Sequence, residues 1–213
     1  EARGAHYASL AEIDVLATKR LSGFDVHWPP EVTQTWTGPE TWANRLQDWR
    51  LHDGRVECLE THPRRPMRTL HLVTTALGEA AEPFWLSVRV RPIEAGKTAD
   101  ASTWAGFLIG AGGPGVDPRL TALVHGRPAR DGGLVCAVDG TGRAVFRDNE
   151  TNDKAGNLWT VVGELAADEL AELTPRDPTT GIFAGKPLGE VNLLLAGHPT
   201  ESGDYTLTMH VAD

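Results

Sequence analysis

Residues 35–60 read TWTGPETWANRLQDWRLHDGRVECLE and join a tryptophan-rich lead-in to a predicted β-hairpin. The hairpin signal is Asp53-Gly54, because this dipeptide readily forms the tight turn between two antiparallel strands. Tryptophan buries a large apolar ring, while its indole N–H needs a polar partner. The lead-in therefore predicts either a heavily packed sheet edge or an exposed platform for sugar rings. Three of the seven tryptophans fall in the first fifteen positions of this stretch: Trp36, Trp42 and Trp49.

Further strands are predicted by apolar residues that alternate with polar ones. In residues 84–90 the apolar positions recur at every second residue, which is typical of a strand with one face in the core and one in water. Many short strands separated by Gly/Pro turns predict an all-β fold, an antiparallel β-sandwich or barrel. The other predicted strands are 55–59, 69–75, 103–110, 120–125, 134–139, 143–147, 190–196 and 205–211, and one short helix is predicted at 166–173. The predicted core residues are Phe84, Leu86, Val88, Val90, Phe107, Ile109, Leu193, Leu195, Leu207 and Met209.

We expect three segments along the chain. Residues 1–17 end in a strand-like run and are interpreted as the terminal strand of a preceding module, or as a tail. Residues 18–34 contain Pro29-Pro30 and little periodicity, so they are interpreted as a linker. Residues 35–213 are expected to form the sandwich domain. Its last predicted strand ends two residues before the end of the chain. If the sheets need a further strand to close, the sandwich is therefore expected to be incomplete at its C-terminus.

Composition narrows the classes of function. The 213 residues carry a net charge of -9 with a pI of about 5.3, which disfavours nucleic acid as a partner because a basic face is needed to bind phosphates. No apolar run approaches the length of about 18 residues that a membrane span needs. Cys58 and Cys136 form a disulfide only if their Cα atoms lie within about 7 Å; two buried free thiols are the alternative.

The wording of residues 36–58 resembles the N-terminal domain of exported bacterial alkaline-phosphatase-D-like proteins. Residues 105–110 (AGFLIG) and 146–149 (FRDN) fit the same resemblance. It implies a concanavalin A-like (laminin-G-like) jelly roll over residues 35–213, and a secreted or periplasmic accessory domain ahead of a phosphatase domain. In addition, residues 7–16 (YASLAEIDVL) are similar to the closing strand of a discoidin-type carbohydrate-binding domain. Together these resemblances imply partners in the form of further domains of the same precursor.

Carbohydrate is the ligand class expected for such a domain. A glycan site needs an exposed aromatic ring beside amides, acids or arginine that can form hydrogen bonds. The lead-in is broken by Gly and Pro, so a ring there can stay exposed, whereas Trp49 and Trp104 lie beside predicted strands. The alternative is that all these rings fasten the lead-in to the sheet. The candidate ligand-binding residues are Trp36, Trp42, Asn44, Arg45 and Asp48.

An acidic loop is a candidate calcium site. Residues 148–153 (DNETND) concentrate carboxylate and amide oxygens, which calcium prefers, and Asp139 closes the preceding strand. The spacing is not that of an EF-hand, so a solvated loop is the simpler interpretation. The candidate ligands are Asp139, Asp148, Asn149 and Asp153.

Residues 12–17 (EIDVLA) favour an enzyme as the alternative function. They resemble the Glu-x-Asp-x-x-Glu strand of laminarinase-type retaining glycosidases, which use two carboxyl groups about 5–5.5 Å apart. Ala17 stands where the acid that protonates the leaving group is needed, and the run is predicted to lie outside the sandwich. We therefore expect a non-catalytic carbohydrate- or surface-binding module, and the alternative is a hydrolase-like sandwich whose catalytic part is missing or degenerate.

Overall fold

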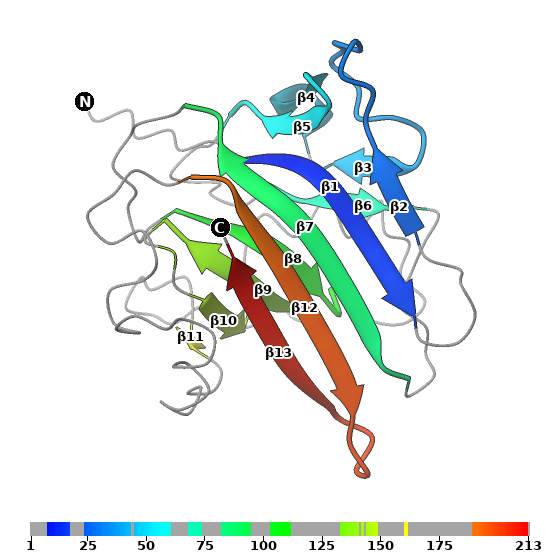
Figure 1. Cartoon of the computed structure of the whole chain (residues 1–213), viewed down its shortest axis with the longest axis vertical. Helices are drawn as coiled ribbons and strands as arrows, with labels where there is room; N and C mark the ends of the chain where they lie inside the picture. The colour runs from blue at the N-terminus through cyan, green and yellow to red at the C-terminus, as the bar shows by residue number, and fades with distance from the viewer. Residues whose placement is uncertain are drawn as a thin grey trace.

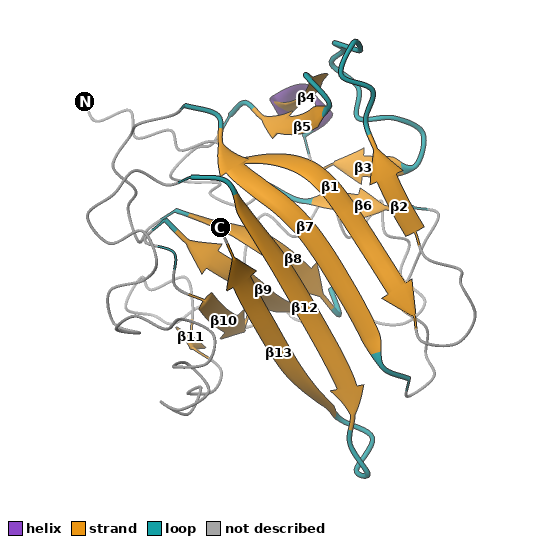
Figure 2. Ribbon diagram, viewed as in Figure 1, coloured by secondary structure: helices purple, strands orange, loops and turns teal. Residues whose placement is uncertain are grey.

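The computed structural model describes residues 8–17, 24–43, 45–60, 68–73, 82–94, 103–111, 133–140, 142, 144–148, 160–161 and 189–212; for 8–17, 24–25, 147–148 and 160–161 it describes the backbone alone. Within these ranges the chain is all-β, with antiparallel sheets and one short 3-10 helix, η1 (Leu46–Asp48) (Figure 2). The strands are β1 (Ala8–Ala17), β2 (Phe24–His27), β3 (Thr41–Ala43), β4 (Trp49–His52), β5 (Arg55–Cys58), β6 (Leu70–Leu72), β7 (Phe84–Pro92), β8 (Trp104–Ile109), β9 (Leu134–Asp139), β10 (Ala144–Asp148), β11 (Thr160–Val161), β12 (Val191–Pro199) and β13 (Tyr205–Ala212).

Two sheets face each other in a sandwich-like arrangement. The larger sheet has the strand order β13-β12-β7-β1-β5-β4, with β2 paired to β1, and the smaller has the order β11-β10-β9-β8 (Figure 1). A third, two-stranded sheet joins β3 to β6. The two antiparallel sheets expected from the alternation are therefore present.

The main core lies between the two large sheets. The larger sheet contributes alternate residues of β7, β12 and β13, because successive side chains of a strand point to opposite faces. The smaller sheet contributes Cys136 and Val138, with Phe107 and Phe146 packed against them. The predicted core is confirmed: six members are buried, Leu86, Val88, Val90, Leu193, Leu195 and Met209. The other four are partly buried against them: Phe84, Phe107, Ile109 and Leu207.

A second core forms under the tryptophan-rich lead-in. The predicted turn is confirmed, since Asp53 (φ 50°) and Gly54 (φ 66°) both adopt the left-handed conformation that a two-residue hairpin turn requires. The resulting pair of β4 and β5 buries one face against β2 and β3. This core comprises Val26, Trp28, Ala43, Trp49, Leu51, Val56 and Cys58.

The N-terminal segments differ from the sequence prediction. We predicted residues 1–17 to be the terminal strand of a preceding module or a tail, and residues 18–34 to be a linker. Instead β1 is hydrogen-bonded along its length to β7 and also pairs with β2 and β5, so it lies inside the larger sheet. Trp28, within the predicted linker, is 8 % exposed and belongs to the second core. The sheet therefore begins well before residue 35.

Cys58 and Cys136 are both free thiols, each in a different core. The predicted strand at 120–125 and the predicted helix at 166–173 lie outside the described residues. In the part of the chain that the structure describes, no helix is long and apolar enough to cross a membrane.

Candidate ligand-binding site

The Trp36 loop, residues 34–41, begins at an anchored position. The backbone of Gln34 pairs with that of Leu51 on the outer side of β4, with N···O distances of 3.1 and 2.7 Å. The side-chain Nε2 of Gln34 donates to the carbonyl oxygen of Trp36 at 2.8 Å. Both contacts hold the backbone that precedes the Trp36 ring.

The other end of the Trp36 loop is anchored as well. Thr41 Oγ1 donates to the carbonyl oxygen of Thr37 at 2.9 Å and lies 3.4 Å from that of Gly38. Thr37 is only 1 % exposed. Gly38 has φ 104°, a conformation that a residue with a Cβ rarely adopts, so glycine allows the chain to turn before Pro39. The loop therefore has a defined backbone on both sides of Trp36.

The Trp36 side chain is exposed, which is one of the two alternatives that the Gly/Pro-broken lead-in left open. It is 51 % accessible to solvent, whereas Trp28 and Trp49 are buried and Trp42, Trp85 and Trp104 are half-buried. Exposure of a large aromatic ring forgoes the free energy that its burial would contribute, about 25 cal/mol per Å² of apolar surface. An exposed ring on an anchored backbone is the arrangement that stacking on a ligand requires, because little conformational freedom is lost on binding.

Trp42 does not form a second open platform. It lies in β3 opposite His71, and its ring is half-buried. Its indole Nε1 is buried and has no hydrogen-bond partner within the described ranges. An unsatisfied buried donor costs about 1–3 kcal/mol. Trp42 is thus mainly a packed ring.

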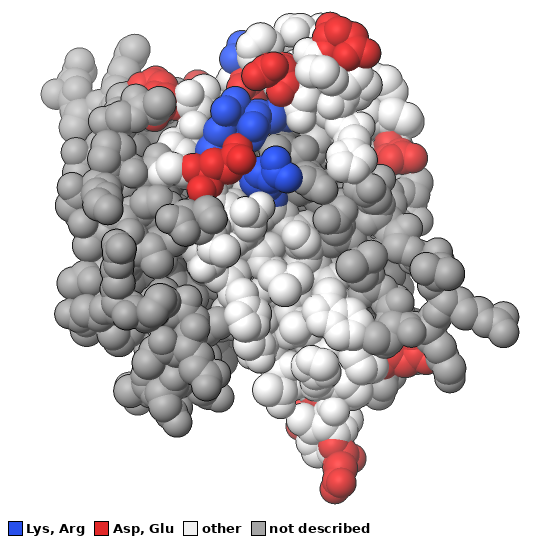
Figure 3. All heavy atoms as spheres, in the orientation of Figure 1, with Lys and Arg blue, Asp and Glu red and all other residues white. Residues whose placement is uncertain are grey.

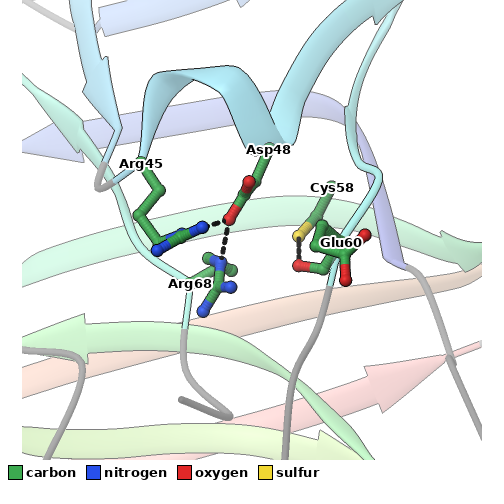
Figure 4. Close-up of polar contacts among 5 residues, drawn as sticks. All are labelled: Arg45, Asp48, Cys58, Glu60 and Arg68. Carbon is green, nitrogen blue, oxygen red and sulfur yellow. Dashed lines mark hydrogen bonds and ion pairs between the residues drawn. The ribbon is translucent and has the colours of Figure 1, made fainter.

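Arg45, Asp48 and Arg68 form an arginine clamp beside the second core. Asp48 Oδ2 accepts from Nε of Arg45 and from Nε of Arg68, each at 2.7 Å (Figure 4). The strand pairing explains why Arg45 and Arg68 lie close together. Ala43 pairs with Leu70, and each residue is two positions from one of the two arginines. Arg45 adopts the left-handed conformation, φ 54°, and its carbonyl oxygen accepts the backbone N–H of Asp48 at 2.7 Å.

The clamp makes Asp48 a structural residue. The Asp48 side chain is 5 % exposed and that of Arg68 is 4 % exposed, so a carboxylate and a guanidinium compensate each other away from water. Asp48 cannot reach a ligand while both arginines hold it. Arg45, whose side chain is 38 % exposed, is the member of the clamp that solvent reaches. Asn44 lies outside the described residues.

Both cysteines are chemically quiet. Burial raises the pKa of the Cys58 thiol to about 11, and hydrogen bonding with the backbone of Glu60 lowers it by a smaller amount. Sγ of Cys58 lies 3.5 Å from the carbonyl oxygen of Glu60 (Figure 4). Burial alone raises the pKa of Cys136 to about 12. Because the thiolate is the nucleophile and the metal ligand, neither sulfur is activated near neutral pH.

The proposed calcium ligands do not share one place. Asp139 ends β9 beside Trp104, whereas Asp148 pairs with Leu134 at the other end of the same hairpin. Five residues of strand separate the two positions, or about 17 Å at about 3.4 Å per residue. Asp139 and Asp148 therefore cannot bind the same ion, which corrects that part of the prediction. Asn149 and Asp153 lie outside the described residues, and among the residues that are described no three His, Cys, Asp or Glu side chains are placed to hold a metal.

Two residues of this region were missed by sequence reasoning. Gln34 fixes the start of the Trp36 loop, and Arg68 neutralises Asp48 from 20 positions away. Neither is part of a motif, and their roles depend on pairings between distant segments. The sequence predicted a strand at residues 69–75 but gave no signal that it would pair beside the lead-in.

Comparison with known proteins adds no relative. No protein-family model, no curated protein and no solved structure matches the chain.

Proposed function

We propose that this chain is a non-catalytic module that binds carbohydrate, or a similar surface polymer, through the exposed ring of Trp36. The single observation that carries the proposal is the 51 % exposure of Trp36 on a loop whose backbone is hydrogen-bonded on both sides. Sugar rings present weakly polar C–H faces that stack on indole, and Arg45 offers a solvent-reached guanidinium near the same lead-in.

The proposal extends to the larger protein by resemblance. The wording of residues 36–58 supports a concanavalin A-like jelly roll within a secreted modular protein, where this chain accompanies a phosphatase domain. The sandwich-like arrangement of the two sheets is compatible with that fold. A binding module of this type would hold the partner domain close to its polymer.

Affinity electrophoresis tests the proposal. Wild-type protein is run through native gels that contain neutral, acidic or phosphorylated polysaccharides, beside Trp36→Ala. We expect one class of gel to retard the wild type, and we expect Trp36→Ala to bind about 30-fold more weakly, the equivalent of about 2 kcal/mol for a central aromatic contact. The melting temperature should hardly change, because the ring is exposed.

Trp85→Ala is the matched control. Trp85 is half-buried on the outward face of β7, edge-on to His198 with ring centroids 6.0 Å apart. If the gel still retards Trp85→Ala but no longer retards Trp36→Ala, the result supports the loop as the binding site. If only Trp85→Ala loses binding to the polysaccharide, the binding site would lie on the sheet face, which would contradict the assignment to Trp36.

The hydrolase alternative gains one observation. Residues 12–14 lie in β1, inside the larger sheet, with the Cα of Glu12 opposite Arg89 and that of Asp14 opposite Ser87. The prediction that this run lies outside the sandwich is therefore wrong. The position of the expected acid is still occupied by Ala17, which has no carboxyl group. Release of reducing sugar by the wild type that is abolished in Glu12→Gln would favour the enzyme over the binding module.

A further inference from the structure

The larger sheet ends in an open strand. β13 is the last strand of the order β13-β12-β7-β1-β5-β4 and pairs with β12 through eight consecutive residues. In the described part of the chain no strand pairs with its other side. In an antiparallel pair, alternate residues direct their N–H and C=O groups away from the partner strand, so one side of β13 presents a row of donors and acceptors.

This edge lacks the features that usually prevent strand addition. Natural edges are protected by charged side chains, proline, bulges or short strands. β13 reads YTLTMHVA, with no Lys, Arg, Asp, Glu or Pro, and its register with β12 is unbroken. The opposite edge is different: β4 has four residues, carries Arg50 and is already paired with Gln34. Strand addition is therefore favoured at β13.

We propose that β13 pairs antiparallel with β13 of a second copy of this chain, which joins the two larger sheets into one continuous sheet. A two-fold axis perpendicular to the sheet keeps each residue on its own face, so the residue at the axis lies opposite itself. We place the axis at Thr208, because threonine opposite threonine is a favourable cross-strand pair. Thr206 then lies opposite His210 on the outer face, and Leu207 opposite Met209 on the core face.

The distribution of charge favours a second copy in this orientation. The chain carries a net charge of -9, yet its β13 edge carries none, so two copies meet without opposed carboxylates. The tip of the β12–β13 hairpin holds Glu201 and Asp204, the acidic group at the lower end of Figure 3. Antiparallel pairing places the two acidic tips at opposite ends of the joint sheet, whereas parallel pairing would bring them together at a cost in repulsion.

Cysteine cross-linking tests the pairing and its register. Residues opposite each other in an antiparallel pair have Cα atoms about 4.5–5.5 Å apart, within reach of a disulfide. Thr208→Cys should therefore form a disulfide-linked dimer under mild oxidation. Thr206→Cys is the matched control, because its two copies would be separated by four residues of strand, about 14 Å. The native Cys58 and Cys136 are buried and should not compete.

Sedimentation velocity gives the second readout. With the axis at Thr208, seven residues of each β13 strand pair, 205–211. This is small beside the roughly 1,600 Å² of a typical stable interface, so we expect a dimer of twice the 23.0 kDa chain mass whose fraction rises between micromolar and near-millimolar protein concentrations. Thr208→Lys should shift the protein to monomer by placing like charges opposite each other, while Asn192→Lys, on the inner strand β12, should not. A wild type that stays monomeric throughout, or a dimer that Thr208→Cys does not cross-link, would overturn the proposal.

Discussion

At the residue scale, the arginine clamp holds the segment between Trp42 in β3 and Trp49 in β4. Asp48 joins Arg45, which is partly exposed, to Arg68, which is buried. The carbonyl oxygen of Asp48 also accepts the N–H of Leu59 at 2.7 Å, so the clamp is connected to the end of β5. The clamp thereby fixes the lead-in against the second core.

Asp48→Asn should lower the free energy of unfolding by about 3–5 kcal/mol, because it replaces the buried carboxylate that accepts from Arg68 and Arg45 with a neutral amide. Asp53→Asn is the matched control: Asp53 is 67 % exposed, lies 3.9 Å from Arg91, and asparagine tolerates its left-handed conformation. Urea denaturation measures both variants. Equal, small effects would show that Asp48 is not a structural anchor.

The two raised thiol pKa values predict a loss of stability in alkali. In the unfolded chain a thiol titrates near its ordinary value of 9.0, while folding raises the pKa of Cys58 to about 11 and that of Cys136 to about 12. Above pH 9 the unfolded state releases protons that the folded state retains, so the free energy of unfolding falls as pH rises, by up to about 1.4 kcal/mol per pH unit for each thiol.

A Cys58→Ala/Cys136→Ala double variant isolates this contribution. Its free energy of unfolding should decline less steeply than that of the wild type between pH 9 and pH 11. Parallel pH profiles for the two proteins would contradict the assigned burial of the thiols.

At the element scale, the larger sheet depends on β1 as its connection. β1 lies between β7 and β5, so without it the sheet would separate into β13-β12-β7 and β5-β4. Period-two alternation predicted β7 and β13, and a Gly-rich turn predicted the hairpin of β9 and β10, because both signals are local. Neither signal could predict the partner of β1, since β7 begins 67 positions after β1 ends and pairing at that separation leaves no local signal. For that reason the run was interpreted as part of another module or as a tail.

Deletion of residues 1–17 should abolish cooperative unfolding or lower the melting temperature sharply, because it removes the ladders to β7, β5 and β2. Deletion of residues 1–7 alone, which leaves β1 complete, is the control. Differential scanning calorimetry compares the two deletions with the wild type. A truncated chain with an unchanged transition would restore the interpretation of residues 1–17 as a separate tail.

At the scale of the whole molecule, charge and exposed apolar surface occupy different regions. Ion pairs gather at one end of the outer face of the larger sheet, where Arg55 and Arg89 lie 2.9 and 3.9 Å from Glu190 (Figure 3). The middle of that face shows few Lys, Arg, Asp or Glu side chains among the described residues (Figure 3). Strand alternation places Trp85, Leu194 and His198 on the same face. Trp36 is exposed elsewhere, on the loop beside β4.

Residues of the candidate site could be predicted from the sequence where their surroundings are local, and could not be predicted where their surroundings come from distant segments. The exposure of Trp36 is linked to a Gly-Pro break within its own loop, so the sequence could offer it as one of two alternatives. The fate of Asp48 depends on Arg68, 20 residues later, so its prediction as a ligand-binding residue could not anticipate the clamp. Trp42, the other candidate ring, is half-buried in β3, which pairs with β6 from a later segment.

Quenching of tryptophan fluorescence by acrylamide tests the Trp36 platform most directly, since among the described tryptophans Trp36 is the most exposed to the quencher. The measurement compares wild type and Trp36→Phe with and without the polysaccharide that retards the wild type on gels. If Trp36 is the binding platform, the polysaccharide should reduce quenching in the wild type and leave quenching in Trp36→Phe unchanged. Equal protection in both proteins, or no protection in either, would contradict a binding site at Trp36.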